Sequence, residues 1–434
     1  MPPKKDKEEV KEEPKKKAKH PRFMTADERR EMFFKAQKEE KPDFHVLRTD
    51  DKEELVPYGL ITLDNVLALR GIGRRGRVSQ IHGDEGAGKS TLTYQIAANY
   101  QKFTGEPVGD YDFERTGSVE FQKRIGINVD ACHFEQPESV EECIQDTCRK
   151  MRDYGIRFFI FDSIPRMKSK VPMDKILKGE AFKQFGGNHA RTMGMFYDLL
   201  LPWAAEYDAN FTMVNQTRDL FADTQEEANA LKWPSYVHPD YDLPGGRICR
   251  FTPSVMIELR LVKSLKACAG KEGEDAFLME PQTPETEGKE LVNMVRVRSL
   301  KNKVTGMGYR QGYIFIRPGQ CVDENMAVRY YARQCGLITY VPAGKRWLVG
   351  DIEKDTIIAN FENKAQAVEH LVASPDQKIL DSLKELTAKK IDQSETQRFS
   401  TELSPAQKTL VEGIVDIPGI DTEPEVGKSG LFEV

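Results

Sequence analysis

The sequence predicts an α/β fold in which helices flank a mostly parallel central sheet. Between about residues 55 and 316, short apolar segments alternate with longer amphipathic ones, as expected for consecutive strand–helix units. A glycine-rich octapeptide, Gly83–Ser90, separates one apolar segment from a helical pattern. The chain has 434 residues and 39% hydrophobic content, which is enough for one large core with additional segments.

The apolar segments within this region have the length and composition of buried strands. The strand candidates are Val78–His82, Phe158–Phe161, Phe211–Val214, Val255–Leu261 and Val295–Leu300. Between them, Val140–Tyr154 is expected to be a helix, because its apolar residues recur at helical spacing. Two long irregular segments follow, one after Asp162 and one between Gln216 and Gly245. Such segments within a compact domain are usually functional or mobile.

The first 53 residues are expected to form a charged disordered tail and a helical arm. Residues 1–19 alternate lysine and glutamate blocks with prolines and carry almost no large apolar side chain, so they cannot bury enough surface to become ordered. Thr25 and Glu28 have the spacing of a capping box, which predicts a short helix that ends before Pro42.

The strand–helix pattern defines a core domain over residues 54–318. Beyond it the composition favours helices, with charged helical patterns at Met326–Gln334 and Lys364–Lys390. These patterns predict a small C-terminal α+β domain over residues 319–391. Residues 392–434 are polar, proline-containing and mildly acidic, which is typical of a flexible tail.

Composition and charge narrow the class of protein. The net charge of −5 excludes a globally basic nucleic-acid binder, so any such contact must rest on local charge. The seven cysteines are scattered and never in CxxC spacing, which indicates neither a disulfide framework nor a zinc site. No segment approaches the roughly 20 apolar residues of a membrane span. We therefore expect a soluble intracellular protein with no membrane partner.

The octapeptide Gly83–Ser90 matches the phosphate-binding P-loop pattern G-x(4)-G-K-[ST]. A strand candidate precedes it, and Leu92, Ile96 and Tyr100 follow at helical spacing. In this order, backbone N–H groups surround phosphate oxygens at a helix N-terminus. The alternative is a glycine-rich turn beside an ordinary surface lysine. The expected ATP-binding residues of this segment are Gly83, Asp84, Glu85, Gly86, Ala87, Gly88, Lys89, Ser90 and Thr91.

Side chains in and beyond the loop extend this nucleotide site. Lys89 is expected to neutralise the β- and γ-phosphates, and the Ser90 hydroxyl to bind Mg²⁺. Asp162 ends a buried strand candidate, where the second magnesium ligand is expected, directly or through water; an aspartate that merely ends a strand is the alternative. Glu114 is the candidate base that orients water for hydrolysis, with Asp112 or a merely solvated carboxylate as the alternative.

The order of these motifs resembles the RecA-type recombinases over about residues 56–316. Gly59–Asp64 is similar to the family's lead-in to the P-loop strand, and Glu85 stands at the family's glutamate position within the loop. Asp112–Glu114 resembles its D-x-E segment. The resemblance therefore implies a RecA-like P-loop NTPase core in which Glu114 is the catalytic base and Phe121 stacks on adenine.

The resemblance also implies a site that two subunits share. Val214–Arg218 resembles the family's I-N-Q-x-R motif, which implies that Gln216 senses the γ-phosphate and transmits this to DNA. Arg296–Lys303 resembles R-V-K-V-V-K-N-K, which implies that Lys301 and Lys303 reach the ATP of a neighbouring subunit. Phe33–Ala36 fits the F-x-x-A pattern with which some recombinases dock on a neighbour; an ordinary amphipathic helix is the alternative reading of these four residues. Independently of this pattern, the N-terminal arm is expected to serve oligomerisation.

DNA contacts are expected in and around the two long irregular segments. Gly245–Phe251 resembles the motif that closes the family's second DNA-binding loop, and Ala190–Met193 resembles its A-R-x-M segment. A helix-surface arginine is the alternative for Arg191. The implied DNA-binding residues are Arg191, Arg218, Gly245, Gly246 and Arg247.

The two DNA loops differ in how well their charge fits DNA. The first is basic, which suits a phosphate backbone, and its cationic residues are Arg166, Lys168, Lys170, Lys175, Lys178 and Lys183. The second is longer than in bacterial members and contains acidic residues, namely Asp219, Asp223, Glu226 and Glu227. Its aromatic residues Trp233, Tyr236 and Tyr241 either stack on bases or pack within the loop itself.

The resemblance implies an ATP-dependent recombinase that forms filaments on single-stranded DNA and exchanges strands with double-stranded DNA in homologous recombination and repair. ATP and Mg²⁺ are the implied cofactors, and a loader or single-strand-binding protein is an implied partner. The alternatives are a hexameric DNA helicase on the same core and a non-catalytic mediator that binds ATP. The expected location is the cytoplasm, of the host where the chain is phage-encoded; bacterial and phage origins both stay open.

Overall fold

The computed structural model describes residues 55–73, 76–170, 188–219, 241–266, 274–279, 283–285, 289–306 and 308–402, with Thr25, Glu28, Glu31 and Lys35. The chain divides into two units, Met1–Glu53 and Glu54–Val434. In the first, the Thr25 N–H donates to Glu28 Oε2 at 2.7 Å and the Glu28 N–H to Thr25 Oγ1 at 3.2 Å, which confirms the capping box. The predictions for residues 1–19, for most of Phe33–Ala36 and for residues 403–434 lie outside the described residues.

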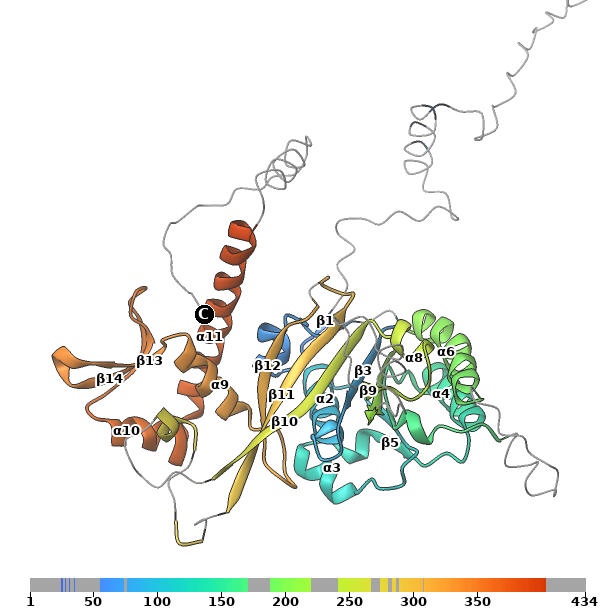
Figure 1. Ribbon diagram of the computed structural model, residues 1–434, viewed down its shortest axis with the longest axis horizontal. Coiled ribbons are helices and arrows are strands. Elements are labelled where there is room, and N and C mark those ends of the chain that lie inside the picture. Colours follow the sequence, from blue (N-terminus) through green and yellow to red (C-terminus); the bar gives the residue numbers. More distant parts are fainter. Residues whose placement is uncertain are drawn as a thin grey trace, which may run out of the picture. The chain divides into compact units, whose positions relative to one another are not determined.

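An eight-stranded sheet forms the centre of the described part of the second unit, in the order β12-β11-β10-β3-β7-β6-β4-β5 (Figure 1). The pairs from β10 through to β5 are parallel, and the pairs β10–β11 and β11–β12 are antiparallel. The predicted α/β fold with a mostly parallel sheet is therefore confirmed. The strands are β3 (Val78–Gly83), β4 (Val108–Asp112), β5 (Cys132–Glu135), β6 (Phe158–Asp162), β7 (Asn210–Gln216), β10 (Val255–Lys266), β11 (Glu290–Asn302) and β12 (Gln311–Ile316).

Helices cover both faces of the parallel strands, which explains why β6 is apolar at four consecutive positions. Phe158 and Ile160 face a core that contains α2 and α3, whereas Phe159 and Phe161 face a second core that contains α4 and α6. Side chains alternate between the two faces of a strand, so each face requires its own apolar residues. The covering helices are α2 (Lys89–Thr104), α3 (Val119–Ile125), α4 (Val140–Tyr154) and α6 (Asn188–Glu206).

The segment after β12 combines helices with a three-stranded antiparallel sheet in the order β13-β14-β15. The predicted helical pattern at Lys364–Lys390 is not one helix, because Pro375 follows the π-helical turn η7 and cannot continue it. The last helix runs to Glu402 and so passes the boundary expected at residue 392. The elements are α9 (Glu324–Gln334), β13 (Ile338–Val341), β14 (Arg346–Asp351), β15 (Thr356–Phe361), α10 (Lys364–Val368), η7 (Glu369–Ala373) and α11 (Gln377–Glu402).

Lys384 of α11 attaches this segment to the lead-in of the P-loop strand. Its Nζ donates to the Gly59 carbonyl at 2.8 Å and pairs with Glu324 Oε1 at 2.7 Å. Glu324 Oε1 also accepts from the Ile61 N–H at 2.8 Å, and Asp64 accepts from the N–H groups of Tyr58 and Gly59. Burial raises the pKa of Glu324 to about 7, and Lys384 counteracts this.

None of the described helices combines the length and apolar character that crossing a membrane requires. Short elements connect the larger ones. The short elements are β1 (Leu55–Val56), η2 (Thr62–Val66), β2 (Ile72–Gly73), η3 (Val129–Ala131), η4 (Ile164–Arg166), β8 (Arg218–Asp219), β9 (Tyr241–Asp242), α8 (Ile248–Phe251), η5 (Glu274–Phe277) and η6 (Pro342–Gly344).

Candidate nucleotide and DNA site

The P-loop joins the end of β3 to the start of α2, as its strand–loop–helix pattern predicts. A side chain at Gly83 would place a Cβ 2.2 Å from the Leu259 carbonyl oxygen of β10, so only glycine fits there. Gly88 precedes α2 with a φ of 84°, in the left-handed region. The first N–H groups of α2 have no partner within the helix and are available to an anion.

Lys89 folds back over its own loop. Its Nζ donates to the carbonyls of Gly83 at 3.0 Å and Asp84 at 2.7 Å. Burial lowers the pKa of Lys89, and the nearby carboxylates of Asp162 and Glu114 counteract this. The cation therefore already lies in the concave part of the loop, where phosphate oxygens can replace the two carbonyls as its partners.

Ser90 and Asp162 lie together, as expected of two magnesium ligands. The Ser90 hydroxyl donates to Asp162 Oδ2 at 2.7 Å. Burial raises the pKa of Asp162 to about 6, and this hydrogen bond counteracts the shift. A hydroxyl and a carboxylate are oxygen ligands of the kind that Mg²⁺ prefers, so this donor set fits the ion.

The carboxyl ends of β4, β6 and β7 bring Glu114, Ser163 and Gln216 into contact. Gln216 Nε2 donates to Glu114 Oε1 at 2.7 Å, and the Ser163 hydroxyl donates to the same oxygen at 2.5 Å. Glu114 and Gln216 come from opposite sides of β6 in the sheet. The structure thus places the two residues that were expected to meet at the γ-phosphate within one hydrogen bond of each other.

The two carboxylates of β4 itself have structural partners, whereas Glu114 follows the strand and is bound by the side chains of Ser163 and Gln216. Asp112 accepts from the N–H groups of Arg115 and Gly117, each at 2.8 Å, and so shapes the turn that carries Glu114. Asp110 is fully buried and accepts from Gln122 Nε2 at 2.7 Å, and burial raises its pKa to about 8. Of the alternatives for the base, this geometry favours Glu114 over Asp112.

Phe121 lies on α3 next to α2. Its half-buried ring meets that of Tyr94 edge-on at 6.1 Å between centroids, and the Arg124 guanidinium lies 6.0 Å from its centroid. Its N–H donates to Ser118 Oγ, the residue that caps α3. These contacts fix the position of the ring, and its role toward adenine stays a prediction.

The exits of the two expected DNA loops lie side by side. His189 Nε2 contacts the Ile164 carbonyl at 2.9 Å, which joins the start of α6 to the start of the first loop. A Cβ at Gly246 would lie 2.7 Å from Ala190 Cβ, so this glycine allows the end of the second loop to pack on α6. The expected DNA-binding arginines around this junction, Arg191, Arg218 and Arg247, are all exposed. Gly245 is buried and packs closely against Cys249.

Several predicted loop residues lie outside the described residues, namely Lys175, Lys178, Lys183, Asp223, Glu226, Glu227, Trp233 and Tyr236. Tyr241 is described and is only 7% exposed. Its hydroxyl lies 3.0 Å from His82 Nε2 and 3.2 Å from Glu258 Oε1, so Tyr241 packs within the protein and not toward a base. The sequence pattern did not single out His82 or Glu258, although a glutamate among the apolar residues of Val255–Leu259 was a signal.

Lys301 and Lys303 gather at the C-terminal end of α8. Lys301 Nζ donates to the carbonyls of Arg250 and Phe251 at 2.8 Å each, and Lys303 Nζ to that of Phe251 at 3.1 Å. Burial, with Lys303 as a further cause, lowers the pKa of Lys301 to about 8. Phe251 beside them is 60% exposed. Both lysines, at the end of β11, therefore contact the segment through which the second loop rejoins the sheet.

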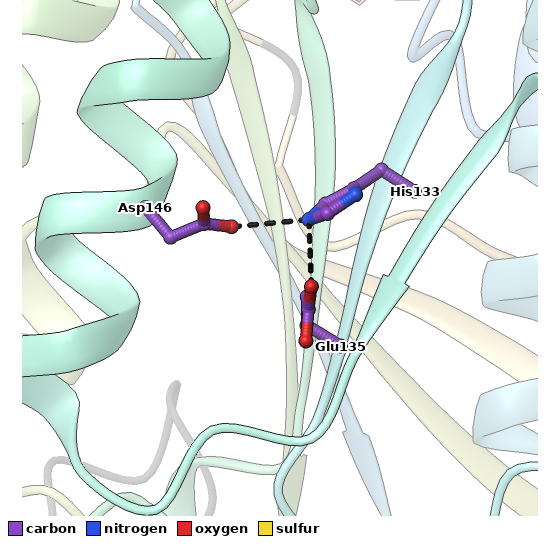
Figure 2. A group of neighbouring side chains, drawn as sticks. All are labelled: His133, Glu135 and Asp146. Atoms are coloured by element: carbon purple, nitrogen blue, oxygen red, sulfur yellow. Dashed lines mark hydrogen bonds and ion pairs between the residues drawn. The ribbon is translucent and has the colours of Figure 1, made fainter.

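A further polar cluster lies at the edge strand β5. Figure 2 shows His133 pointing between Glu135 on its own strand and Asp146 of α4. His133 Nε2 lies 3.0 Å from Asp146 Oδ2 and 3.5 Å from Glu135 Oε1. Asp146 also accepts from the Tyr111 hydroxyl and pairs with Arg149. Protein groups thus satisfy Asp146, and the cluster attaches β5 to α4.

Comparison with known proteins gives the family. Residues 46–278 match the RecA N-terminal domain. Protein RecA of Streptomyces coelicolor is 28% identical over 277 residues, which cover 64% of this chain and 64% of that protein. Protein RecA of Ruminococcus albus is 30% identical over 213 residues, 49% of each chain. Protein RecA of Symbiobacterium thermophilum is 24% identical over 331 residues, 76% of this chain and 83% of that protein.

The match to the Streptomyces protein spans slightly less than two thirds of that relative's length. The match to the RecA N-terminal domain covers more than half of this chain and includes the P-loop, Glu114, Asp162 and Gln216. The chain therefore belongs to the RecA family.

Proposed function

We propose that this protein is an ATP-dependent DNA strand-exchange recombinase that assembles a helical filament on single-stranded DNA. One observation carries the proposal. Gln216 ends β7, donates to the carboxylate of Glu114, and leads within two residues into β8, the first strand at the base of the second loop. A single stretch of backbone therefore links the hydrolytic site to the expected DNA site.

The residues around the P-loop have separate roles in this proposal. Lys89 and the N–H groups at the start of α2 hold the triphosphate, and Glu114 accepts a proton from the attacking water. Ser90 and Asp162 would hold Mg²⁺, which neutralises charge on the phosphates when bound. Gln216 exchanges its bond with Glu114 for a bond with the γ-phosphate, and this exchange moves the base of the second loop.

Self-assembly completes the site. Lys301 and Lys303 lie together beside the exposed ring of Phe251, and their bonds to carbonyls hold both cations at one end of α8. In a filament these two cations reach the ATP of the neighbouring subunit, so hydrolysis requires two adjacent subunits. Single-stranded DNA, a homologous duplex and a loader or single-strand-binding protein are the proposed partners, in the cytoplasm.

A strand-exchange assay tests this function. The full chain is incubated with ATP, Mg²⁺, circular single-stranded DNA and a homologous linear duplex, and joint molecules are counted on a gel. The wild type should form joint molecules, and a heterologous duplex should give none. Lys89→Ala should abolish both joint molecules and DNA-stimulated ATP hydrolysis, whereas Lys102→Ala at the other end of α2 should retain both. DNA unwinding without strand exchange would instead identify a helicase.

A further inference from the structure

The hydroxyl of Tyr241 joins the P-loop strand to the returning strand of the second loop. It lies 3.0 Å from Nε2 of His82 on β3 and donates to Oε1 of Glu258 on β10 at 3.2 Å. All three side chains are buried, with 0%, 7% and 1% of the residue exposed for His82, Tyr241 and Glu258. His82 directly precedes Gly83, the first residue of the P-loop.

Two partly exposed arginines, Arg260 and Arg298, flank this buried group. Arg260 Nε lies 3.3 Å and Arg298 Nε 3.5 Å from carboxylate oxygens of Glu258, and the Arg260 guanidinium lies 5.8 Å from the centroid of the Tyr241 ring. A buried carboxylate is destabilising unless cations and hydrogen-bond donors surround it. Glu258 therefore holds its partners in fixed positions, and we call Tyr241, His82, Glu258 and the two arginines the Glu258 network. Tyr241 is the residue of this network that comes from the end of the second loop.

The base of the second loop contacts the P-loop region through both of its strands. On the outgoing side, Gln216 binds Glu114, and the Thr217 hydroxyl donates to Asp84 Oδ1 at 2.6 Å. On the returning side, Tyr241 contacts His82. The two sides pair with each other as β8 and β9, with Asp219 opposite Tyr241. The outgoing contacts involve Glu114 and Asp84, which face the nucleotide in the proposed function, whereas the returning contact is buried in the protein.

We propose that Tyr241 is a positioning residue that anchors the returning strand of the second loop to the P-loop strand. This inference rests on the proposed function. When Gln216 and Thr217 respond to the nucleotide, the outgoing strand moves while Tyr241 holds its partner in place. The paired strands β8 and β9 then turn about Tyr241, and this turn couples the nucleotide to DNA affinity. Without the anchor, both strands shift together and the coupling weakens.

The test removes only the hydroxyl. Affinity for a fluorescein-labelled single-stranded oligonucleotide is measured by anisotropy for the full chain with ATPγS and with ADP, and the ratio of the two dissociation constants reports the coupling. Tyr241→Phe should lower this ratio about 3- to 10-fold, as expected when a buried hydroxyl loses its hydrogen bonds to His82 and Glu258. The KM for ATP and the ATPase rate without DNA should stay unchanged.

Tyr331→Phe is the matched control. Tyr331 is 5% exposed, and its hydroxyl accepts from the Tyr313 N–H at 2.6 Å, so this variant also loses a buried hydroxyl contact, but between β12 and α9. It should keep the wild-type ratio. Adding Glu258→Gln to Tyr241→Phe should lower the ratio no further, because both residues belong to one network.

The outcomes separate the two proposals. A wild-type ratio in Tyr241→Phe, or an equal loss in both tyrosine variants, would overturn the anchoring role and leave the recombinase assignment standing. A ratio near one in the wild type itself would contradict nucleotide-controlled DNA binding, and with it both proposals.

Discussion

The phosphate-binding end of the sheet and its antiparallel side use polar side chains in different ways. At the carboxyl ends of the parallel strands, Glu114 and Gln216 bind each other, and in the proposed function they exchange that bond for one to a ligand. On β10 and α9, Glu258 and Glu324 bind cationic side chains of the protein. Because both regions contain carboxylates held within the protein, position at the carboxyl end of a parallel strand is a better guide to a ligand site than burial is.

The largest expected effect is a loss of ATP hydrolysis when Glu114, at the phosphate-binding end of the sheet, is changed. Glu114→Gln keeps the size of the side chain but removes the base, so ATP hydrolysis with single-stranded DNA should fall at least about 100-fold. Because the amide oxygen of the new side chain can still accept from Ser163 and Gln216, the free energy of unfolding should change by less than about 1 kcal/mol. Steady-state ATPase assays and urea unfolding measure the two quantities. Glu120→Gln, an exposed change on α3, is the control, and wild-type hydrolysis in Glu114→Gln would remove this residue from the mechanism.

The opposite result is expected on the antiparallel side, where Lys384→Ala leaves Glu324 without its cation. Above pH 7, where Glu324 is ionised, this should destabilise the fold by about 2 kcal/mol, less than for a fully buried pair. The Glu324 side chain is 22% exposed, so contact with solvent reduces this loss of stability. ATP binding by the isolated chain should be unaffected, because the pair lies away from the ligand-facing strand ends.

The same pair should respond to pH. Burial raises the pKa of Glu324 to about 7, so the folded state holds a proton that the unfolded chain releases above about pH 4.3. The wild-type free energy of unfolding should therefore fall as pH rises from about 4.3 to about 7. The effect of Lys384→Ala should be largest above pH 7 and disappear toward pH 5, where Glu324 is neutral. Urea unfolding at pH 5 and pH 8 measures this, with Lys389→Ala on the same helix as the control. A pH-independent difference would contradict the ionised pair.

A smaller effect, on the pH dependence of ATPase activity, tests whether the charge of Lys301 acts on the bound ligand. Its pKa of about 8 means that it loses its charge as pH rises through that value. Wild-type DNA-dependent ATPase should fall severalfold between about pH 7.5 and pH 9, whereas Lys301→Arg, which stays charged, should hold its activity. Lys263→Arg, an exposed change on β10, should follow the wild-type profile. Identical pH profiles for all three proteins would show that Lys301 binds only protein groups and does not act as a cation on a ligand.

The smallest expected effect concerns one surface charge. Arg191 is exposed beside the junction of the two loops. Arg191→Ala should make the dependence of log affinity for single-stranded DNA on log salt less steep by about 0.7, the loss of one phosphate contact. Anisotropy titrations at several salt concentrations give the slope. Arg152→Ala on α4 is the control, and an unaltered slope in Arg191→Ala would favour an ordinary helix-surface arginine.

Local pattern predicted much of the fold. The five strand candidates all lie within observed strands, and the Val140–Tyr154 helix has its predicted bounds because Ser139 and Gly155 cap its two ends. The sequence did not delimit β13, β14 and β15. These strands are short and partly exposed, so they lack a clear apolar alternation.

Part of the candidate site could likewise be predicted from local pattern, and part could not. Residues of the P-loop and of the strand ends follow from motif order, because parallel strands bring their carboxyl ends together. The contacts of Tyr241 with His82 and Glu258 join three separate segments of the chain, so no local pattern contains them. Only the packing of β9 on β3 and β10 decided between base stacking and self-packing for Tyr241.

Electron microscopy of the full chain with single-stranded DNA and a slowly hydrolysed ATP analogue can show whether two adjacent subunits share the ATP site. We expect an open helical filament in which Lys301 and Lys303 of one subunit lie at the P-loop of the next. A closed ring, or a filament in which both lysines keep their bonds to α8 away from the nucleotide, would contradict it.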